Sequence, residues 1–323
     1  MKIILTGISG FVGSLLSKKL KELNHEVIGL DKINPKHDNF DHFIKVDLIE
    51  FNLTELILKK LKNSKLIIHC AAAKGDFMLT SKDFFNDNVL VTETIKIISQ
   101  RIKCNNIIHY STVSVYGHNN KLKDENCILN PNNAYGATKL QSEKILIKWQ
   151  KIDSKNRNLN ILRPSVIYGE NNYANMFNLI NQLNKKYPIS IGKGNYIKSM
   201  IAVENIVQIT IFLINKLNGI KIFNCIDKPY VNLSEVINYI CEIKGFNKPI
   251  IKIPFILAYI LSIPFELFSY FLRKDFGINR DRVYKYNTPT DFRSEKLFSM
   301  GYIQKYKTKE RIQNMAKWYL NIK

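Results

Sequence analysis

Short apolar runs alternate with longer amphipathic segments through the first half of the chain. The runs KIILT, EVIGL, HFIKV, KLIIH, NIIHY and LNILR are rich in β-branched residues, which is typical of parallel strands buried on both faces. Between them, apolar residues recur with helical spacing at about 10–23, 52–62, 80–103 and 132–151. This alternation predicts an α/β fold of the Rossmann type, a doubly wound parallel sheet with helices on both faces.

The alternation weakens after about residue 170, where helical segments with a few short strands follow. A chain of 323 residues is long enough for a nucleotide-binding domain and a smaller second lobe. We therefore expect residues 1–170 to form the nucleotide-binding domain that carries the catalytic residues. Residues 171–323 would form predominantly a substrate-binding lobe, with some segments returning to the Rossmann core.

The most hydrophobic segment is IPFILAYILSIPFELFSYFL at 253–272. A membrane-spanning helix needs roughly 20 such residues, but Pro264 should break a helix midway and Glu266 would be costly in lipid. We therefore expect two short helices packed on the substrate lobe. A membrane-surface or partner-binding patch stays open as the alternative, because basic residues follow the segment, namely Arg273, Lys274, Arg280 and Arg282.

Composition narrows the class of protein. The formal net charge is +21, but no basic block is interleaved with aromatic residues, so we expect no nucleic acid partner. The five cysteines show neither CxxC nor metal-ligand spacing, so we expect no disulfide framework and no metal site. The N-terminus reaches glycine too soon for the apolar core of a signal peptide. We expect a cytoplasmic protein, with any membrane association confined to 253–272.

The stretch ILTGISGFVGSLL places three glycines between a predicted strand and a predicted helix. In nucleotide-binding folds the first glycine permits the tight turn, the second lets the backbone approach a diphosphate, and the third lets helix and strand pack closely. The helix N-terminus offers backbone N–H groups to the phosphates. The candidate residues for this site are Gly7, Gly10, Phe11, Val12 and Gly13.

Asp31 ends the second predicted strand, in VIGLD. At this offset from the glycines a carboxylate hydrogen-bonds the adenosine ribose hydroxyls and repels a 2′-phosphate. The sequence therefore favours NAD over NADP as the cofactor. The alternative is an ordinary turn residue at the end of a strand.

Tyr135 and Lys139 lie four residues apart in NAYGATKLQSEK, where a predicted helix begins. That spacing places both side chains on one helix face, one turn apart. A phenol with a pKa of about 10 is a poor base at neutral pH, but a nearby ammonium and a positively charged nicotinamide ring would favour the phenolate. The pair therefore indicates proton transfer, although the same spacing occurs on ordinary solvated helices.

Eight motifs occur in order between residues 6 and 169: TGISGFVG, LD, VDL, HCAAAKG, DNV, STVSVYG, YGATK and LRPSVIYG. Together they resemble the extended short-chain dehydrogenase/reductases, in particular the NAD-dependent epimerase/dehydratase family that includes UDP-sugar 4-epimerases. The resemblance implies that Tyr135 and Lys139 are the catalytic pair and that Asn88 supports the active-site helix. It also implies that cofactor contacts come from Tyr135, Lys139, Asp47, Leu48, Ala71, Ala72, Lys74 and Asn88.

The stretch STVSVYG holds three hydroxyls within four residues. In the family, the catalytic hydroxyl lies four residues before the Tyr of VYG, which implies Thr112. Side chains alternate along a strand, so Thr112 and Ser114 should share a side and Ser111 should point away. We assign Ser111 a supporting, substrate-binding role. Family dehydratases carry Asp and Glu where this chain has Val113 and Ser114, which implies hydride exchange without elimination of water.

The segment ISIGKGNYIKSMIAVENIV resembles the part of the family that meets the substrate diphosphate. Lys198 stands where the family has Arg and would bind phosphate as a point charge. Arg282 is the candidate for a second phosphate contact, ahead of Arg293.

The resemblance implies an NAD-dependent 4-epimerase or 4-ketoreductase that acts on a UDP-hexose or UDP-N-acetylhexosamine in surface-polysaccharide synthesis. It also implies a homodimer that pairs the helices at 80–103 and 132–151. Two alternatives stay open: a 3β-hydroxysteroid dehydrogenase-like oxidoreductase, and a non-catalytic NAD-binding or RNA-binding protein of the same fold.

Overall fold

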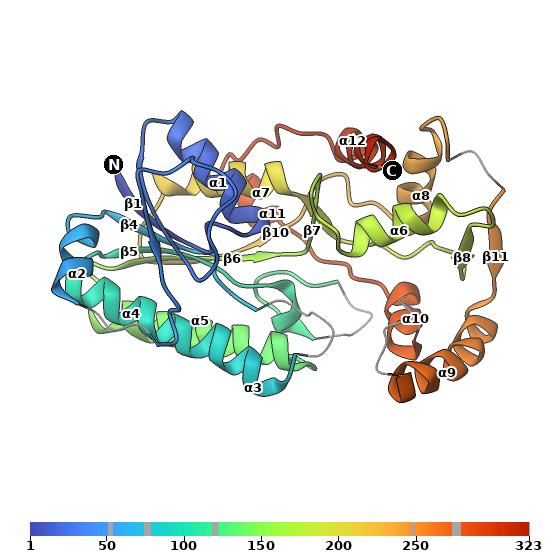
Figure 1. The fold of residues 1–323 in the computed structure, drawn as a ribbon, viewed down its shortest axis with the longest axis horizontal. Helices are drawn as coiled ribbons and strands as arrows, with labels where there is room; N and C mark the ends of the chain where they lie inside the picture. Colours follow the sequence, from blue (N-terminus) through green and yellow to red (C-terminus); the bar gives the residue numbers. More distant parts are fainter. Residues whose placement is uncertain (51–53, 74–78, 118–121, 247–248, 273–278, 323) are drawn as a thin grey trace.

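The computed structural model describes residues 1–50, 54–73, 79–117, 122–246, 249–272 and 279–322. Within these residues the centre of the molecule is a seven-stranded parallel sheet with the order β10-β6-β5-β4-β1-β2-β3 (Figure 1). Its strands are β1 (Lys2–Thr6), β2 (Glu26–Asp31), β3 (His42–Lys45), β4 (Leu66–His69), β5 (Asn106–Tyr110), β6 (Asn158–Pro164) and β10 (Ile220–Cys225). All six predicted strands are present, and the Rossmann-type fold class is confirmed.

Helices cover both faces of the sheet. Above it in Figure 1 lie α1 (Phe11–Glu22) and α7 (Val203–Ile214), which contact each other. Below it lie α4 (Val91–Ile102) and α5 (Ala134–Ile152), also in contact, with the shorter α2 (Glu55–Leu61) beside α4. The amphipathic segments of the sequence therefore form helices close to the predicted positions.

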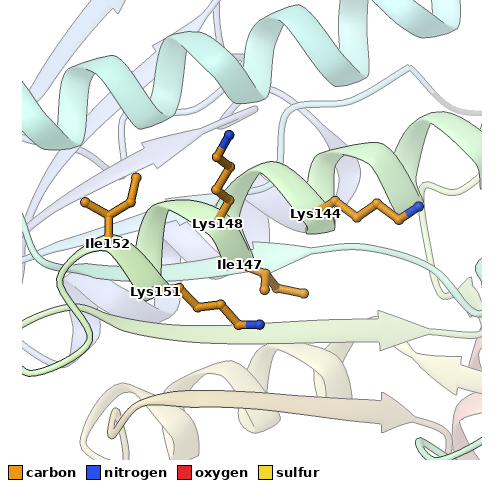
Figure 2. Close-up of a pocket in the computed structure, with 5 residues that line it drawn as sticks. All are labelled: Lys144, Ile147, Lys148, Lys151 and Ile152. Carbon is orange, nitrogen blue, oxygen red and sulfur yellow. The ribbon is translucent and has the colours of Figure 1, made fainter.

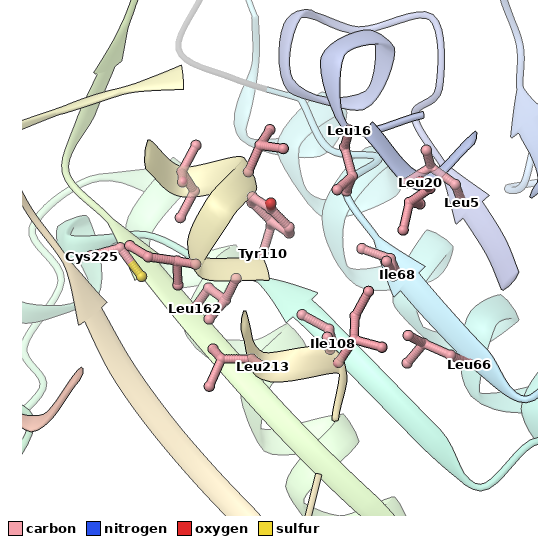
Figure 3. Close-up of a cluster of buried hydrophobic side chains, with 14 of the residues drawn as sticks. Leu5, Leu16, Leu20, Leu66, Ile68, Ile108, Tyr110, Leu162, Leu213 and Cys225 are labelled. Atoms are coloured by element: carbon pink, nitrogen blue, oxygen red, sulfur yellow. The ribbon is translucent and has the colours of Figure 1, made fainter. Parts of the chain in front are cut away.

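The apolar side chains of the sheet pack into two hydrophobic cores, one on each face. Alternate residues of a strand point to opposite faces, so Ile3 and Leu5 pack with α1 and α7, whereas Ile4 packs with α4 and α5. Figure 3 shows part of the first core, where Leu16 and Leu20 of α1 lie with several strand residues, among them Leu66, Ile68, Ile108 and Leu162. Burial on both faces explains why these strands are apolar at almost every position.

The chain returns to the sheet after residue 171. Helix α7 packs on α1, and β10 forms the edge strand beside β6, with Ile222 opposite Ile161. The short α11 (Glu295–Ser299) then packs on β10. Segments from the second half of the chain therefore complete the first core.

The remaining elements form a smaller lobe beside the ends of the strands (Figure 1). Its core holds Ile180, Ile240 and Ile312, which come from three different helices. The lobe contains α6 (Asn175–Leu183), α8 (Leu233–Cys241), α12 (Thr308–Asn321) and the two strand pairs β7 (Val166–Tyr168) with β9 (Met200–Ala202) and β8 (Ile189–Ile191) with β11 (Ile251–Ile253).

The apolar segment at 253–272 departs from the sequence prediction. It forms one helix, α9 (Phe255–Leu272), which continues through Pro264, followed by α10 (Arg280–Asn287). The prediction of two short helices was wrong, because a proline removes one backbone donor and need not end a helix. The expected packing on the lobe was also wrong, because most large side chains of α9 are exposed to solvent.

Two glycines fix how closely α1 approaches the sheet. Gly7 has a φ of +70°, and a Cβ on it would lie 2.8 Å from the backbone nitrogen of Ala71. A Cβ on Gly13 would lie 2.0 Å from the carbonyl oxygen of Gly7, whereas one on Gly10 would lie 3.1 Å from that oxygen. Helix α1 can therefore contact the turn after β1 only because Gly13 has no side chain.

We expect Gly13→Ala to lower the free energy of unfolding by about 1–3 kcal/mol, because the added methyl meets backbone that cannot rotate away. Gly10→Ala, with its looser contact, is the matched control and should cost less. Denaturant unfolding of both variants measures the difference. Equal losses would contradict the steric role given to Gly13.

Candidate active site

The cofactor end of the site lies where β1 meets α1, at the carboxyl edge of the sheet. Gly10 is the N-cap of α1, and no side chain caps this end of the helix. Because the first backbone N–H groups of a helix have no partner within it, those of Phe11 and Val12 are available to an anion. The turn from Gly7 to Gly13 brings this helix end close to the ends of the strands.

Asp31 lies at the end of β2, beside this turn. Its carboxylate accepts hydrogen bonds from the backbone N–H groups of Ser9, at 2.9 Å, and Ile33, at 3.0 Å. The contact with Ile33 is that of an ordinary turn residue, the alternative that the sequence left open. The contact with Ser9 joins Asp31 to the glycine turn. The position suits a ribose that follows a diphosphate at the helix end.

The other residues predicted to contact the cofactor flank this turn. Ala71 donates its backbone N–H to the Thr6 hydroxyl at 3.2 Å, so the end of β4 adjoins the end of β1. Ala72 next to it is exposed, and Asp47 and Leu48 follow β3. Lys74 lies outside the described residues.

The first turn of α5 carries Tyr135 to the loop after β5. Asn133 caps the helix by accepting a hydrogen bond from the Gly136 N–H at 2.8 Å. A Cβ on Gly136 would lie 2.5 Å from the carbonyl oxygen of Ser114. This close approach, which the sequence analysis did not use, brings Tyr135 next to Thr112.

Thr112 begins the 3-10 helix η2 (Val113–Tyr116) and accepts a hydrogen bond from the Ser114 N–H at 3.1 Å. Its hydroxyl also lies 3.2 Å from that of Ser114. The two hydroxyls share a side as predicted, but through a helical turn, because β5 ends at Tyr110. Burial raises the pKa of the Tyr135 phenol, and a hydrogen bond with Thr112 partly offsets the rise. The sequence suggested that the ammonium of Lys139 would lower the pKa of Tyr135. In the chain without a cofactor, the effect of burial is larger, and the pKa of Tyr135 is raised.

Lys139 is almost fully buried, one helical turn beyond Tyr135. Burial lowers the pKa of its ammonium to about 8, with Glu143 acting in the opposite direction, so the charged form predominates at neutral pH. The charge also acts on two histidines, His69 of β4 and His109 of β5, whose rings lie 5.1 Å apart. Burial, reinforced by Lys139, lowers the pKa of His69 to about 3 and that of His109 well below its usual value. Both histidines are therefore neutral.

Asn88 lies in a π-helical turn, η1 (Phe85–Leu90), between α3 (Ser81–Phe84) and α4. Its side-chain amide nitrogen donates to the Thr138 hydroxyl at 3.0 Å, and its backbone carbonyl accepts from the Ser142 hydroxyl at 2.9 Å. Both partners belong to α5. Asn88 thus fixes the helix that carries Tyr135 and Lys139.

A buried ion pair behind the site was missed by the sequence analysis. Arg163 of β6 donates two hydrogen bonds to Glu143 of α5, from Nε at 2.9 Å and from Nη2 at 2.7 Å. Ser111 donates its hydroxyl to the same carboxylate, and Arg163 also donates to the Tyr116 hydroxyl at 2.8 Å. Tyr116 in turn donates to Asn224 of β10 at 2.8 Å. The sequence signal was limited to Arg163, a charged residue in an otherwise buried strand, because Glu143 lies among several charged residues of an amphipathic helix.

This network determines the orientation of Ser111 and the protonation state of Tyr116. Ser111 is buried and points toward Glu143, which is away from Thr112 as predicted but does not place it at the open end of the site. Burial raises the pKa of Tyr116 to about 12, so its hydroxyl stays protonated.

Apart from Ser111, the residues predicted to contact the substrate come from the second half of the chain. Lys198 is half-buried and donates to the carbonyl of Thr288, and burial lowers its pKa to about 8. Arg282 is in α10, and its side chain lies outside the described part. Arg293 donates to Asp291 at 3.0 Å and stacks on Tyr230.

A surface hollow elsewhere runs along the outer face of α5. Figure 2 shows its lining from one helix, Lys144, Ile147, Lys148, Lys151 and Ile152. The predicted site residues of α5, Tyr135 and Lys139, lie at the other end of the helix, so this hollow is not part of the site. Among the described residues, no cluster of His, Cys, Asp or Glu could hold a metal ion.

A model of the NAD dependent epimerase/dehydratase family matches residues 3–225. The chain belongs to this family. NAD is therefore the cofactor, and the resemblance seen in the motifs is confirmed. The uncapped helix end, the glycine turn and Asp31 form a cradle that fits this dinucleotide.

Individual members of the family show the range of similarity. N-acetyl-alpha-D-glucosaminyl-diphospho-ditrans,octacis-undecaprenol 4-epimerase of Escherichia coli O157:H7 is 29% identical over 308 residues, 94% of this chain and 91% of that protein. A dTDP-D-glucose 4,6-dehydratase of Dictyostelium discoideum is 31% identical over 241 residues, 64% of this chain and 54% of that protein. The crystal structure of UDP-glucuronic acid 4-epimerase from Bacillus cereus with NAD has a TM-score of 0.78 and 21% identity, covering 100% of this chain and 99% of that one.

We expect Glu143→Ala to lower the free energy of unfolding by about 3–5 kcal/mol, because it leaves the buried Arg163 charge without a partner. The control is Glu242→Ala, which breaks an exposed pair with Lys309 and should cost about 1 kcal/mol or less.

A double variant separates charge from packing in the same unfolding measurements. Glu143→Leu combined with Arg163→Met removes both charges and should be more stable than Glu143→Ala alone. A double variant no more stable than Glu143→Ala would show that lost packing, and not the stranded charge, causes the loss.

Proposed function

We propose that this protein inverts the configuration at C4 of a hexose that is carried on a diphosphate, with NAD as the cofactor. The observation that supports this most is the group formed by Thr112, Tyr135 and Lys139 at the edge of the sheet beside the dinucleotide cradle. A hydroxyl pair next to a buried ammonium can accept and return the proton of a sugar hydroxyl.

Each of the three residues has a distinct role in this proposal. The Tyr135 phenolate accepts the proton of the 4-hydroxyl and returns it at the end of the reaction. Thr112, which already hydrogen-bonds Tyr135, also holds the sugar O4 in line with the phenol. Lys139 favours the phenolate electrostatically and holds the nicotinamide ribose. Asn88 and Glu143 keep these groups in place without touching the substrate.

NAD, when bound, supplies a positively charged nicotinamide ring that accepts a hydride from C4 reversibly and favours the phenolate. The residues of the cradle bind and orient it: the N–H groups of Phe11 and Val12 hold the diphosphate, and Asp31 holds the ribose of adenosine. Retention of the cofactor between the two half-reactions makes the protein an epimerase and not a net reductase.

We propose that the protein is not a dehydratase, although one relative is. Elimination of water needs an acid and a base beside the sugar, and the two positions that serve in family dehydratases hold Val113 and Ser114. The nearby carboxylate of Glu143 is committed to Arg163 and Ser111. No elimination step is therefore assigned to this site.

The substrate class follows from the relatives. The relative from Escherichia coli takes its sugar on undecaprenyl diphosphate, and the structure from Bacillus cereus is of an enzyme named for a UDP-sugar. A hexose on a diphosphate is common to both names. We propose an N-acetylhexosamine as the sugar, Lys198 as a diphosphate contact, and a role in surface-polysaccharide synthesis.

We also propose the assembly and domain roles that the resemblance implied. Residues 1–170 bind NAD, and most of 171–323 binds substrate, apart from α7, β10 and α11 in the core. A homodimer would pair α4 and α5 of two copies. The outer face of α5 carries Lys144, Lys148 and Lys151, so this pairing would strengthen with ionic strength (Figure 2).

We expect Tyr135→Phe to lower kcat for C4 inversion by roughly 10²–10⁴-fold, because it removes the proton acceptor and leaves the fold and the cradle intact. Tyr187→Phe, which removes an exposed hydroxyl, is the control and should retain normal turnover. Calorimetry should show unchanged NAD affinity in both variants. Near-normal turnover of Tyr135→Phe would refute the assignment.

A further inference from the structure

The amphipathicity of α9 is reversed. The face that packs toward α10 carries small or polar residues one turn apart, Ala258, Ser262 and Glu266. The face turned to solvent is almost wholly apolar, and Ile256 and Phe271 are 71% and 76% exposed. Its large exposed side chains are Ile256, Leu257, Ile260, Leu261, Ile263, Phe265, Leu267, Phe268, Phe271 and Leu272. A helix facing water would have the opposite arrangement.

The contact with α10 involves the polar side of α9. Glu266 accepts a hydrogen bond from Nε of Arg280 at 2.8 Å, and this ion pair joins the two helices while both side chains stay partly exposed to solvent. Figure 1 shows the two helices side by side at the margin of the lobe, on the side of the sheet where α4 and α5 lie. The helix pair therefore presents its apolar face outward. Monomeric proteins rarely expose so many contiguous apolar side chains without a binding role.

Charge distinguishes the candidate occupants of this face. The chain has a net charge of +21, so an anionic surface would be attracted to it, whereas a second copy at this face would have to overcome the repulsion between like charges. The sequence directly after α9 adds to this, with five basic residues against Asp275 and Asp281: Arg273, Lys274, Arg280, Arg282 and Lys285. An apolar helix that is followed in the sequence by several cationic residues has the composition of a helix that lies in the interface of an anionic bilayer.

The helix suits a position along the bilayer surface. None of the helices in the described part of the chain is long and apolar enough to cross a membrane. We infer that α9 docks this protein on an anionic lipid bilayer, with its exposed face among the headgroups and the upper acyl chains.

The docked helix pair is tied directly to the substrate lobe. After α10, the Thr288 carbonyl accepts a hydrogen bond from Lys198. Thr290 then donates its N–H to Ile197 at 3.0 Å and accepts from the Ser199 N–H at 3.1 Å. The residues that follow α10 therefore hold residues 197–199 in place. These belong to the segment that resembles the diphosphate-binding part of the family. Docking places this segment close to the membrane surface.

This placement deepens the proposed function, on which it rests. Of the two carriers named above, a nucleoside diphosphate comes from solution and gains nothing from docking. A polyprenyl diphosphate keeps its lipid chain in the bilayer and presents its sugar at the surface. We therefore assign a polyprenyl-diphosphate-linked hexose as the substrate.

Vesicle sedimentation tests the docking. The probe is vesicles of phosphatidylethanolamine and phosphatidylglycerol in equal parts, compared with vesicles of phosphatidylcholine. The test variant is Ile256→Ser, Ile260→Ser and Phe268→Ser in one chain. The control replaces three exposed apolar residues elsewhere, Leu56→Ser, Ile128→Ser and Ile303→Ser.

The intact protein and the control should partition to anionic vesicles at least about tenfold more strongly than the test variant. Phosphatidylcholine should retain less of each protein. Failure of the intact protein to bind anionic vesicles, or equal binding of the test variant, would overturn the docking. So would an oligomer that only the test variant dissociates, because the face would then serve a second copy.

Turnover separates the carrier from the activity itself. C4 inversion is compared for undecaprenyl-diphospho-N-acetylglucosamine in anionic vesicles and for UDP-N-acetylglucosamine in solution. The lipid-linked sugar should be preferred, and the preference should fall about tenfold in the test variant but not in the control. Preference for the UDP-sugar would overturn the lipid carrier. Inversion of neither would refute the proposed function, while the sedimentation result would stand.

Discussion

The buried ion pair between Glu143 and Arg163 holds together the parts of the protein that carry the catalytic residues. It joins α5 to β6, and through Ser111 and Tyr116 it reaches the end of β5, the turn η2 and β10. A buried pair of an arginine and a carboxylate is tolerated only when each of its polar atoms has a hydrogen-bond partner in good geometry. This requirement fixes the positions of the elements that supply those partners. Tyr135 lies on α5, and Thr112 lies between Ser111 and Tyr116, which both hydrogen-bond the pair, so we infer that the contact of Thr112 with Tyr135 depends on it.

Much of the framework was readable in the sequence because its causes are local. A strand buried on both faces must be apolar along its length, and a turn that approaches a helix end needs glycine, as Gly7 and Gly13 show. Thr112 could be selected only through the spacing of a family motif. The pair of Glu143 and Arg163 could not be predicted, because the two residues are 20 positions apart and meet only once α5 packs on the sheet.

The helix α9 shows where hydrophobicity fails as a guide. A run of large apolar residues was expected to be buried, and Pro264 was expected to divide it. The hydrophobicity of a segment shows that its side chains favour burial, but not whether the rest of the chain covers them. Here the neighbouring α10 contacts the polar side of α9, where Arg280 pairs with Glu266. The apolar side is left for a partner, which we assign as a bilayer. Proximity of that surface to Lys198 links the docking to the choice of substrate.

We propose that the site removes hydrogen from C4 and returns it to the opposite face of the same sugar. The most direct measurement uses an N-acetylhexosamine diphosphate substrate with deuterium at C4, turned over without added NAD or NADH and analysed by NMR. We predict an inverted product that keeps its deuterium at C4 and gains none from solvent. Loss of the deuterium, or formation of a 4-keto-6-deoxy sugar with release of water, would rule out this mechanism.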